Sequence, residues 1–186
     1  EIYGPKGPYM DFSIENMACT LKYDPSERKL TEDVEIQNVV EKSKKHIISF
    51  NGKYSKNIPK KNTISNLLKI LEKKRLITGH KFEIKVNKHI PSKSGLGGGS
   101  MNAANILKYL IKKKFINPSR GQLSLICKSV GSDVALGLNS TFTILKSNNE
   151  IKEFKNCKKF YALIVKPSFG CSTKEIYSSV KKFTKP

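Results

Sequence analysis

The sequence predicts an α+β fold with a mixed sheet, because segments with two different apolar periods alternate along it. Three segments repeat their apolar residues every three or four positions, as amphipathic helices do: residues 63–77, 100–114 and 119–131. Shorter segments alternate apolar and polar residues, as half-buried strands do. The sequence has no internal repeat and no low-complexity segment, so we expect an ordinary globular chain.

Strands are predicted where short alternating runs lie between turn residues. Within an alternating N-terminal part that spans 12–50, and further along the chain, they fall at 34–40, 45–50, 79–91, 140–146 and 159–167. In the third of these, Phe82, Ile84 and Val86 share one face, and Pro91 closes the strand.

Helices are predicted at the three amphipathic segments and at 172–183. Thr63 and Ser119 are the expected N-caps of the first and third helices, and Gly131 is the expected stop of the third. Ser172 or Thr173 would cap the last helix. The second helix has one apolar face, formed by Ala103, Ile106, Leu107, Leu110 and Ile111.

Length and hydropathy indicate a soluble, folded protein that is not secreted. The 186 residues, 38% of them hydrophobic, are enough for one large domain or one and a half small ones. No segment has the run of about 18 apolar residues that a membrane span requires. The N-terminal EIYGPKGPYMD lacks the apolar core of a signal peptide.

The formal net charge of +20 raises the question of nucleic-acid binding. Of the 35 basic residues, all but Arg28, Arg75 and Arg120 are lysine, whereas base recognition and bidentate phosphate contacts favour arginine. A solvated lysine surface that helps to attract anionic substrates is the favoured interpretation, and an RNA-binding module is the alternative.

The cysteines and histidines do not indicate a metal site. Cys19, Cys127, Cys157 and Cys171 are widely spaced and form no CxxC pair, and the three histidines are isolated. We expect buried thiols in a reducing compartment.

The stretch SGLGGGS, residues 94–100, predicts an anion-binding turn at the start of a helix. Gly95, Gly97, Gly98 and Gly99 would let backbone N–H groups approach phosphate oxygens, and Ser100 could add a hydroxyl to a phosphate or to Mg²⁺. The stretch is neither a P-loop nor GxGxxG. The alternative interpretation is a flexible turn or a helix C-cap.

Asp133, in VGSDVALGL (130–138), is the candidate catalytic carboxylate. It could be a partly desolvated group that accepts or orients a hydroxyl proton during phosphoryl transfer. It could equally be the N-cap of the following turn. The residues alone leave both interpretations open.

Four motifs in the same order resemble those of the GHMP kinases, and they cover about residues 62–178. The stretch IPSKSGLGGGSMNAANIL resembles the ATP-binding motif, and its triple glycine is most similar to the 4-diphosphocytidyl-2-C-methyl-D-erythritol kinase branch. NTISNLLKIL resembles the helix that begins at a family asparagine, here Asn62. GSDV resembles the motif of the catalytic aspartate, and LIVKPSFGCSTKEIY resembles a segment with a substrate-stacking aromatic residue.

The resemblance implies an N-terminal GHMP kinase domain, similar in fold to ribosomal protein S5 domain 2, with two layers formed by a mixed sheet and helices. It implies transfer of the ATP γ-phosphate to the 2-hydroxyl of 4-diphosphocytidyl-2-C-methyl-D-erythritol, in the non-mevalonate route to isoprenoids, with Mg²⁺ on the phosphates. Asp133 would act on the acceptor hydroxyl, and Tyr177 would stack on the cytosine. The implied ATP-binding residues are Asn62, Pro91, Gly95, Leu96, Gly97, Gly98, Gly99 and Ser100.

Departures from the family pattern concern the acceptor side. The family's P-x-K-x-N strand corresponds to GPKGPYM, where Lys6 is present but Pro8 replaces the asparagine, so neither role is transferred. The DGYH substrate motif becomes DFSIENM, which leaves Phe12 and Ser13 as weak substrate-binding candidates. Residues 1–186 are therefore expected to be an incomplete kinase without the family's C-terminal domain.

An inactive kinase remnant is the remaining alternative. The pathway that the resemblance implies operates in the bacterial cytoplasm and in plastids (chloroplast or apicoplast), and both compartments fit the sequence. A small molecule is the expected partner, with no membrane.

Overall fold

The computed structural model describes residues 10–13, 20–23, 33–38, 45–138, 142–145, 150–154, 160–161, 170, 176 and 178–180. Its strands are β1 Met10–Ser13, β2 Thr20–Tyr23, β3 Asp33–Asn38, β4 Ile47–Asn51, β5 Phe82–Asn87, β6 Phe142–Leu145, β7 Ile151–Phe154 and β8 Phe160–Tyr161. Its helices are α1 Thr63–Lys73, α2 Gly98–Lys112 and α3 Arg120–Val130, followed by two 3₁₀ turns, η1 Ser132–Val134 and η2 Leu136–Leu138.

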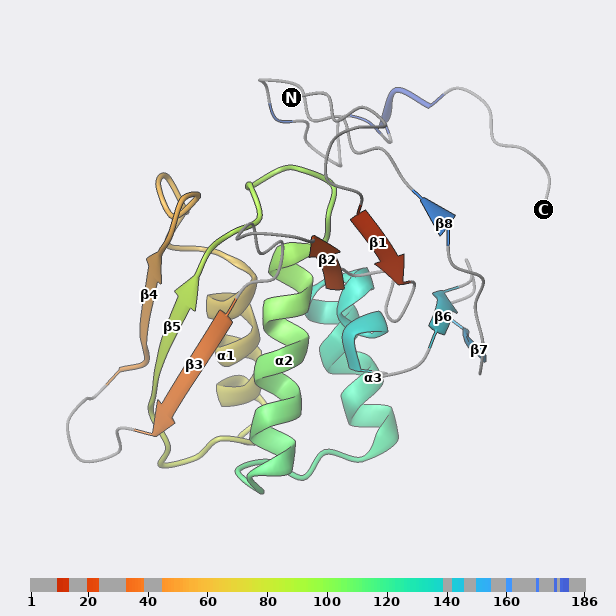
Figure 1. Cartoon of the computed structure of the whole chain (residues 1–186). Coiled ribbons are helices and arrows are strands. Elements are labelled where there is room, and N and C mark those ends of the chain that lie inside the picture. Colours follow the sequence, from red (N-terminus) through yellow and green to blue (C-terminus); the bar gives the residue numbers. More distant parts are fainter. Residues whose placement is uncertain are drawn as a thin grey trace.

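The central sheet has the strand order β3-β5-β4, with β5 antiparallel to β3 and parallel to β4. Figure 1 shows this sheet beside the helices, with α1 and α2 packed on one side of it. Two smaller antiparallel sheets join β2-β1-β8 and β6-β7. The predicted α+β class with a mixed sheet is confirmed, whereas β7 was missed by the sequence analysis.

The core lies between β5 and the helices. Phe82, Ile84 and Val86, the predicted inward face of β5, are fully buried. The face of α2 is confirmed at four of its five positions, and Ile111 is partly buried against the same core. α1 contributes Ile64, Leu67, Leu68 and Leu71 to this core. These contacts fix both ends of the segment that carries the glycines.

The helix starts follow capping chemistry, with one correction. Ser119 caps α3 as predicted, in a capping box with Gln122, and Gly131 ends this helix. The prediction of Thr63 as the cap of α1 is wrong, because Asn62 caps this helix and Thr63 is its first residue. Asn62 is the cap because its Oδ1 accepts hydrogen bonds from two backbone N–H groups. In addition, the Ser65 hydroxyl, three positions further on, accepts a hydrogen bond from the Asn62 N–H.

Helix ends also differ from the sequence prediction. The first helix ends at Lys73 rather than at residue 77. Arg75 and Lys114 follow α1 and α2 in the left-handed region, with φ of +56° and +59°. The N–H three residues beyond the last helical residue bonds back to the helix in both cases. Leu76 donates to the carbonyl of Leu71, and Phe115 donates to the carbonyl of Leu110. Both ends are Schellman motifs formed without glycine.

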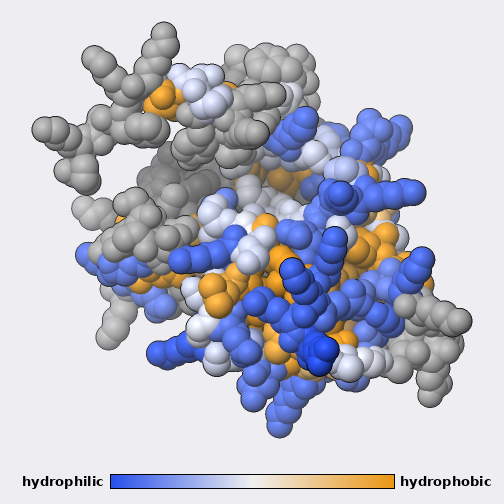
Figure 2. Space-filling view, turned by 180° about the vertical axis from the view of Figure 1, so that it is seen from behind, coloured by the Kyte–Doolittle hydropathy of each residue, from blue (hydrophilic) through white to orange (hydrophobic). Residues whose placement is uncertain are grey.

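The described surface is strongly hydrophilic, as the lysine content predicts. Figure 2 shows blue side chains over much of the described part of one face, with smaller hydrophobic areas between them. In the described ranges, no helix is long and apolar enough to cross a membrane. The remainder of the predicted strand at 159–167 and most of the predicted helix at 172–183 lie outside the described residues.

Candidate functional site

The glycine turn connects the end of β5 to the start of α2. β5 is extended by two hydrogen bonds at Lys88, whose N–H donates to the Asn51 carbonyl (2.7 Å) and whose carbonyl accepts from the Tyr54 N–H (3.2 Å). The chain then passes buried Ile90 and half-buried Pro91 before it reaches the glycines. The turn is therefore held at its first end by the central strand.

A glycine is suited to each of these four positions for one of two structural reasons. Gly95 and Gly97 have φ of +74° and +66°, which side chains adopt only under strain. Gly98 and Gly99 already belong to α2. A Cβ on Gly98 would lie 3.3 Å from the Ile90 side chain, and one on Gly99 would lie 3.0 Å from Oγ1 of Thr63.

The N-terminus of α2 has no side-chain cap. Gly97 occupies the cap position, and its carbonyl accepts the Met101 N–H at 3.0 Å. α1 and α3, by contrast, both begin with capping boxes. The first amides of α2, at Gly98, Gly99 and Ser100, therefore have no acceptor from the cap residue and suit an anion.

Asp133 lies within η1, next to this turn. A Cβ on Gly131 would be 3.7 Å from the Ser100 hydroxyl, so η1 and the first turn of α2 are neighbours. The Asp133 carboxylate is exposed and accepts a hydrogen bond from the Ser132 hydroxyl at 2.9 Å. Both of its sequence interpretations need correction: Gly131, not Asp133, occupies the cap position of η1, and the carboxylate is not desolvated.

The remaining predicted residues are only partly brought together. Asn62 uses its side chain locally, because Oδ1 caps α1 and Nδ2 donates to the Pro59 carbonyl at 3.1 Å. Leu96 is half-buried in the turn. Phe12 and Ser13 belong to β1, where their backbones pair with β2. Tyr177 lies outside the described residues.

One contact that the sequence analysis missed brings a distant part of the chain to the turn. Lys93, with φ of +57°, lies within the turn, and its Cβ is 3.1 Å from the position of a Cβ on Gly170. Gly170 belongs to the SFGCS stretch whose motif resembles a substrate-binding segment. The sequence signal for this contact was the glycine within a motif of the family. Nothing in the sequence indicated that Lys93 would be the residue beside it.

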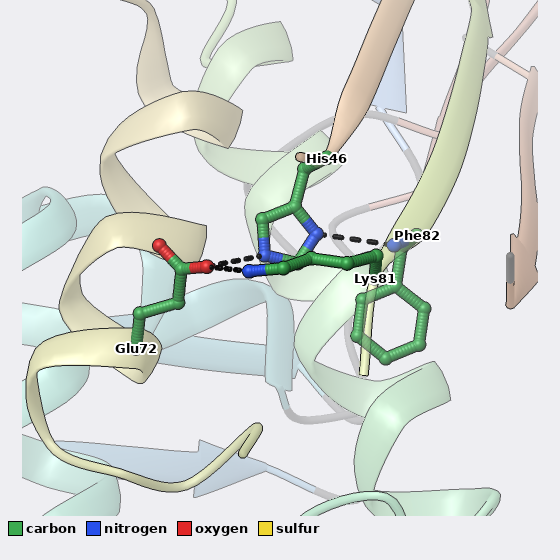
Figure 3. A network of polar contacts seen from close by, with 4 residues as sticks. All are labelled: His46, Glu72, Lys81 and Phe82. Atoms are coloured by element: carbon green, nitrogen blue, oxygen red, sulfur yellow. Dashed lines mark hydrogen bonds and ion pairs between the residues drawn. The ribbon is translucent and has the colours of Figure 1, made fainter. Parts of the chain in front are cut away.

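A second polar cluster lies at the opposite end of β5 (Figure 3). The Phe82 N–H donates to Nδ1 of His46 (3.1 Å), and Nε2 of His46 is 3.2 Å from Oε1 of Glu72. The Lys81 ammonium bonds the same oxygen at 2.5 Å. Burial lowers the pKa of His46, and the hydrogen bond from Lys81 lowers the pKa of Glu72. This cluster joins α1 to the sheet and is structural.

The described side chains include the buried thiol of Cys127 and no metal-binding cluster. Cys127 is buried, and burial raises the pKa of its thiol to about 11, as expected for an unreactive cysteine. In the part of the chain that the structure describes, no group of three or more His, Cys, Asp or Glu residues could hold a metal ion.

The uncapped glycine start of α2 suits an anionic group such as a phosphate, and the turn that carries Asp133 lies beside it. Residues 62–145 match the family described as the GHMP kinases N terminal domain, and this part of the chain is such a domain.

Within that class, the chain resembles one particular enzyme. It is 56% identical over 144 residues to the 4-diphosphocytidyl-2-C-methyl-D-erythritol kinase of Pelagibacter ubique (strain HTCC1062), covering 77% of this chain and 51% of that protein. It is 34% identical over 101 residues to the enzyme of the same name from Leptospira biflexa serovar Patoc, covering 54% of this chain and 32% of that protein. The chain thus spans about half the length of the Pelagibacter relative and less of the other.

A solved structure titled 4-(cytidine 5'-diphospho)-2C-methyl-D-erythritol kinase is also similar. It has 23% sequence identity and a TM-score of 0.48, and the match covers 68% of this chain and 42% of that one. The relatives named here give no support to the RNA-binding alternative.

Proposed function

We propose that the protein is an ATP-dependent kinase that phosphorylates the 2-hydroxyl of 4-diphosphocytidyl-2-C-methyl-D-erythritol. The observation that carries the proposal is the uncapped start of α2 next to η1, which puts free helix amides and a carboxylate on neighbouring turns. The name of the Pelagibacter relative, at 56% identity, supports the substrate. A non-mevalonate isoprenoid step in a bacterial cytoplasm or a plastid is part of the same proposal.

On this proposal the triphosphate of ATP binds at the first turn of α2. The amides of Gly98, Gly99 and Ser100 and the positive end of the helix dipole would stabilise its charge. Gly95, Leu96 and Gly97 would shape the turn, with Pro91 and Asn62 at its margins. Tight approach of the backbone is available because neither Gly98 nor Gly99 carries a side chain.

Mg²⁺, when bound, neutralises charge on the phosphate oxygens. The donor set fits an ion held mainly by those phosphates, because Ser100 offers a hydroxyl and the described residues hold no carboxylate cluster.

Asp133 is proposed to orient the acceptor hydroxyl and to accept its proton. Its exposed carboxylate accepts one hydrogen bond from the described residues, that of the Ser132 hydroxyl, which leaves lone pairs available for this task. The acceptor would be positioned from the other side by Tyr177, with Phe12 and Ser13 as weaker candidates. Residues 1–186 would supply the ATP-binding half, and the family's second domain would complete the acceptor site.

The test compares phosphorylation of the cytidyl substrate by the full-length protein and by Asp133→Asn. Loss of the carboxylate should reduce kcat by about 10²–10⁴-fold, the usual contribution of a general base. Glu153→Gln removes another exposed carboxylate, on β7, and should leave kcat unchanged. Equal rates for Asp133→Asn and the parent protein would remove Asp133 from the mechanism.

Nucleotide binding is tested separately by the thermal shift on addition of Mg-ATP. Gly98→Asp places a carboxylate where phosphates are proposed and also crowds Ile90. This variant should fold less stably and lose the shift. A parent protein without any shift at millimolar Mg-ATP would contradict the proposed function.

A further inference from the structure

The backbone conformation of Gly99 does not explain why a glycine occupies this position. It is exposed, it has no positive φ, and it occupies the first turn of a helix, where glycine is less favourable than alanine. The neighbours of a Cβ at this position belong to a single residue: Oγ1 of Thr63 would lie at 3.0 Å and Cβ of Thr63 at 3.8 Å. The space that a side chain at residue 99 would need is therefore occupied by Thr63.

Thr63 is itself held firmly in place. It is the first residue of α1, directly after the capping asparagine, and the capping box fixes the backbone on both sides of it. The next residue, Ile64, is buried in the core with 2% exposure. A β-branched side chain on such a backbone has few rotamers, so the position of its hydroxyl is restricted.

The first turn of α2 is thus contacted by three different segments of the chain. Ile90, after β5, packs against Gly98; Gly131, before η1, lies beside Ser100; and Thr63, at the start of α1, faces Gly99. Of these contacts, the one with Thr63 joins the starts of α1 and α2, which are 35 residues apart in the chain. It sets how closely the two helix starts approach each other.

We propose that Thr63 is a positioning residue that fixes the first turn of α2, and with it the amides that would bind a nucleotide. This inference deepens the proposed function, on which its nucleotide readout rests. An added methyl group at residue 99 would push the turn or Thr63 by a few tenths of an ångström, and removal of the Thr63 side chain would restore the space. Residues 63 and 99 should therefore behave as a coupled pair.

The experiment is a double-mutant cycle with Gly99→Ala, Thr63→Ala and the double variant, measured by Mg-ATP titration calorimetry. Gly99→Ala should weaken binding at least about fivefold, because displaced amides align poorly with phosphate oxygens. Thr63→Ala should weaken it about two- to threefold, and the double variant should bind within about twofold of Thr63→Ala.

Gly121→Ala is the matched control. Gly121 also lies in the first turn of a helix, α3, but an added Cβ there would meet nothing within 4 Å. It should raise the urea midpoint through helix propensity and leave nucleotide affinity unchanged. Gly99→Ala should fail to raise this midpoint, whereas the same change in the Thr63→Ala background should raise it.

Two outcomes would overturn the inference. One is parent-like Mg-ATP affinity and a raised urea midpoint for Gly99→Ala, which would mean that Thr63 moves aside without displacing the first turn of α2. The other is a double variant whose binding is weakened by the product of the two single effects, at least about tenfold, which would mean that the two positions are independent. If the parent protein itself bound no Mg-ATP, the proposed function would fail, and the urea midpoints would still decide the coupling of residues 63 and 99.

Discussion

Replacement of Asn62 by alanine is expected to lower the free energy of unfolding by about 1.5 kcal/mol. Oδ1 accepts the N–H groups of Ile64 and Ser65, each at 3.0 Å, and both groups would lose their partner. Loss of an N-cap side chain costs about 0.5–2 kcal/mol. We take the upper half of that range because the cap is part-buried and the bond from Nδ2 to Pro59 is lost as well.

The assay is urea and thermal unfolding of matched variants. In a chain of this size, 1 kcal/mol moves Tm by about 2–4 °C, so Asn62→Ala should lower Tm by about 3–6 °C. Asn62→Asp keeps an acceptor and should cost less than about 0.5 kcal/mol. Ser65→Ala removes the reciprocal bond to the Asn62 N–H (2.9 Å) and should cost about 0.5–1 kcal/mol.

The same variants separate a capping role from a nucleotide-binding role. Asn62→Asp preserves the cap but adds a negative charge near the proposed phosphate site, so it should weaken Mg-ATP binding while Tm stays near the parent value. An aspartate variant as unstable as the alanine variant would refute the capping argument. An alanine variant within about 0.3 kcal/mol of the parent protein would refute it too, because this is below the smallest expected cap loss.

Three further predictions concern other parts of the fold. Lys114→Gly should raise the free energy of unfolding by about 0.5–1 kcal/mol, because it removes a strained left-handed residue after α2. Gly137→Ala should lower it by about 1–3 kcal/mol, because the new Cβ would lie 2.5 Å from Cβ of Ala104. The free energy of unfolding should decrease as the pH falls below 6.5. Burial lowers the pKa of His46 in the folded protein, and the hydrogen bond that Nδ1 accepts from the Phe82 N–H also opposes protonation. The unfolded chain therefore takes up the proton first, which favours unfolding.

Urea titrations check all three. Lys112→Gly, in the last turn of the same helix, should destabilise, which separates the backbone effect at Lys114 from loss of charge. A Gly137→Ala protein with an unchanged midpoint would show that η2 can move away from α2. His46→Gln should flatten the pH dependence of the free energy of unfolding between about pH 7.5 and 5.5, which is above the range in which Glu72 titrates. An unchanged slope would show that another group causes the pH dependence.

The sequence predicted the elements whose signals are local. The inward face of β5 and the Ser119 cap of α3 both follow from patterns that span fewer than about ten residues. The choice between Asn62 and Thr63 was harder, because both are good N-cap residues and adjacent. The decision came from Ser65, which closes a capping box without the usual Glu or Gln at that position.

The site was predicted as a set of residues and not as an arrangement. The four glycines appear equivalent in the sequence. In the structure, two of them adopt a positive φ, and at the other two an added side chain would crowd a neighbouring residue. The contact between Thr63 and Gly99, and that between Lys93 and Gly170, join residues that are far apart in the chain. Local periodicity carries no information about such pairs. The exposure of Asp133 likewise depends on how η1 packs, which only the folded chain defines.

The central position of β5 has a consequence for how the molecule opens. This strand is paired on both sides, by β3 and β4, and the glycine turn begins only a few residues after its end. Its amides should exchange with solvent deuterium only through global unfolding, whereas the exposed residues of the turn should exchange through small local fluctuations. The loop of residues 92–95 is thus a low-stability stretch between two high-stability anchors, and it can rearrange around a ligand while the first turn of α2 and the core stay in place.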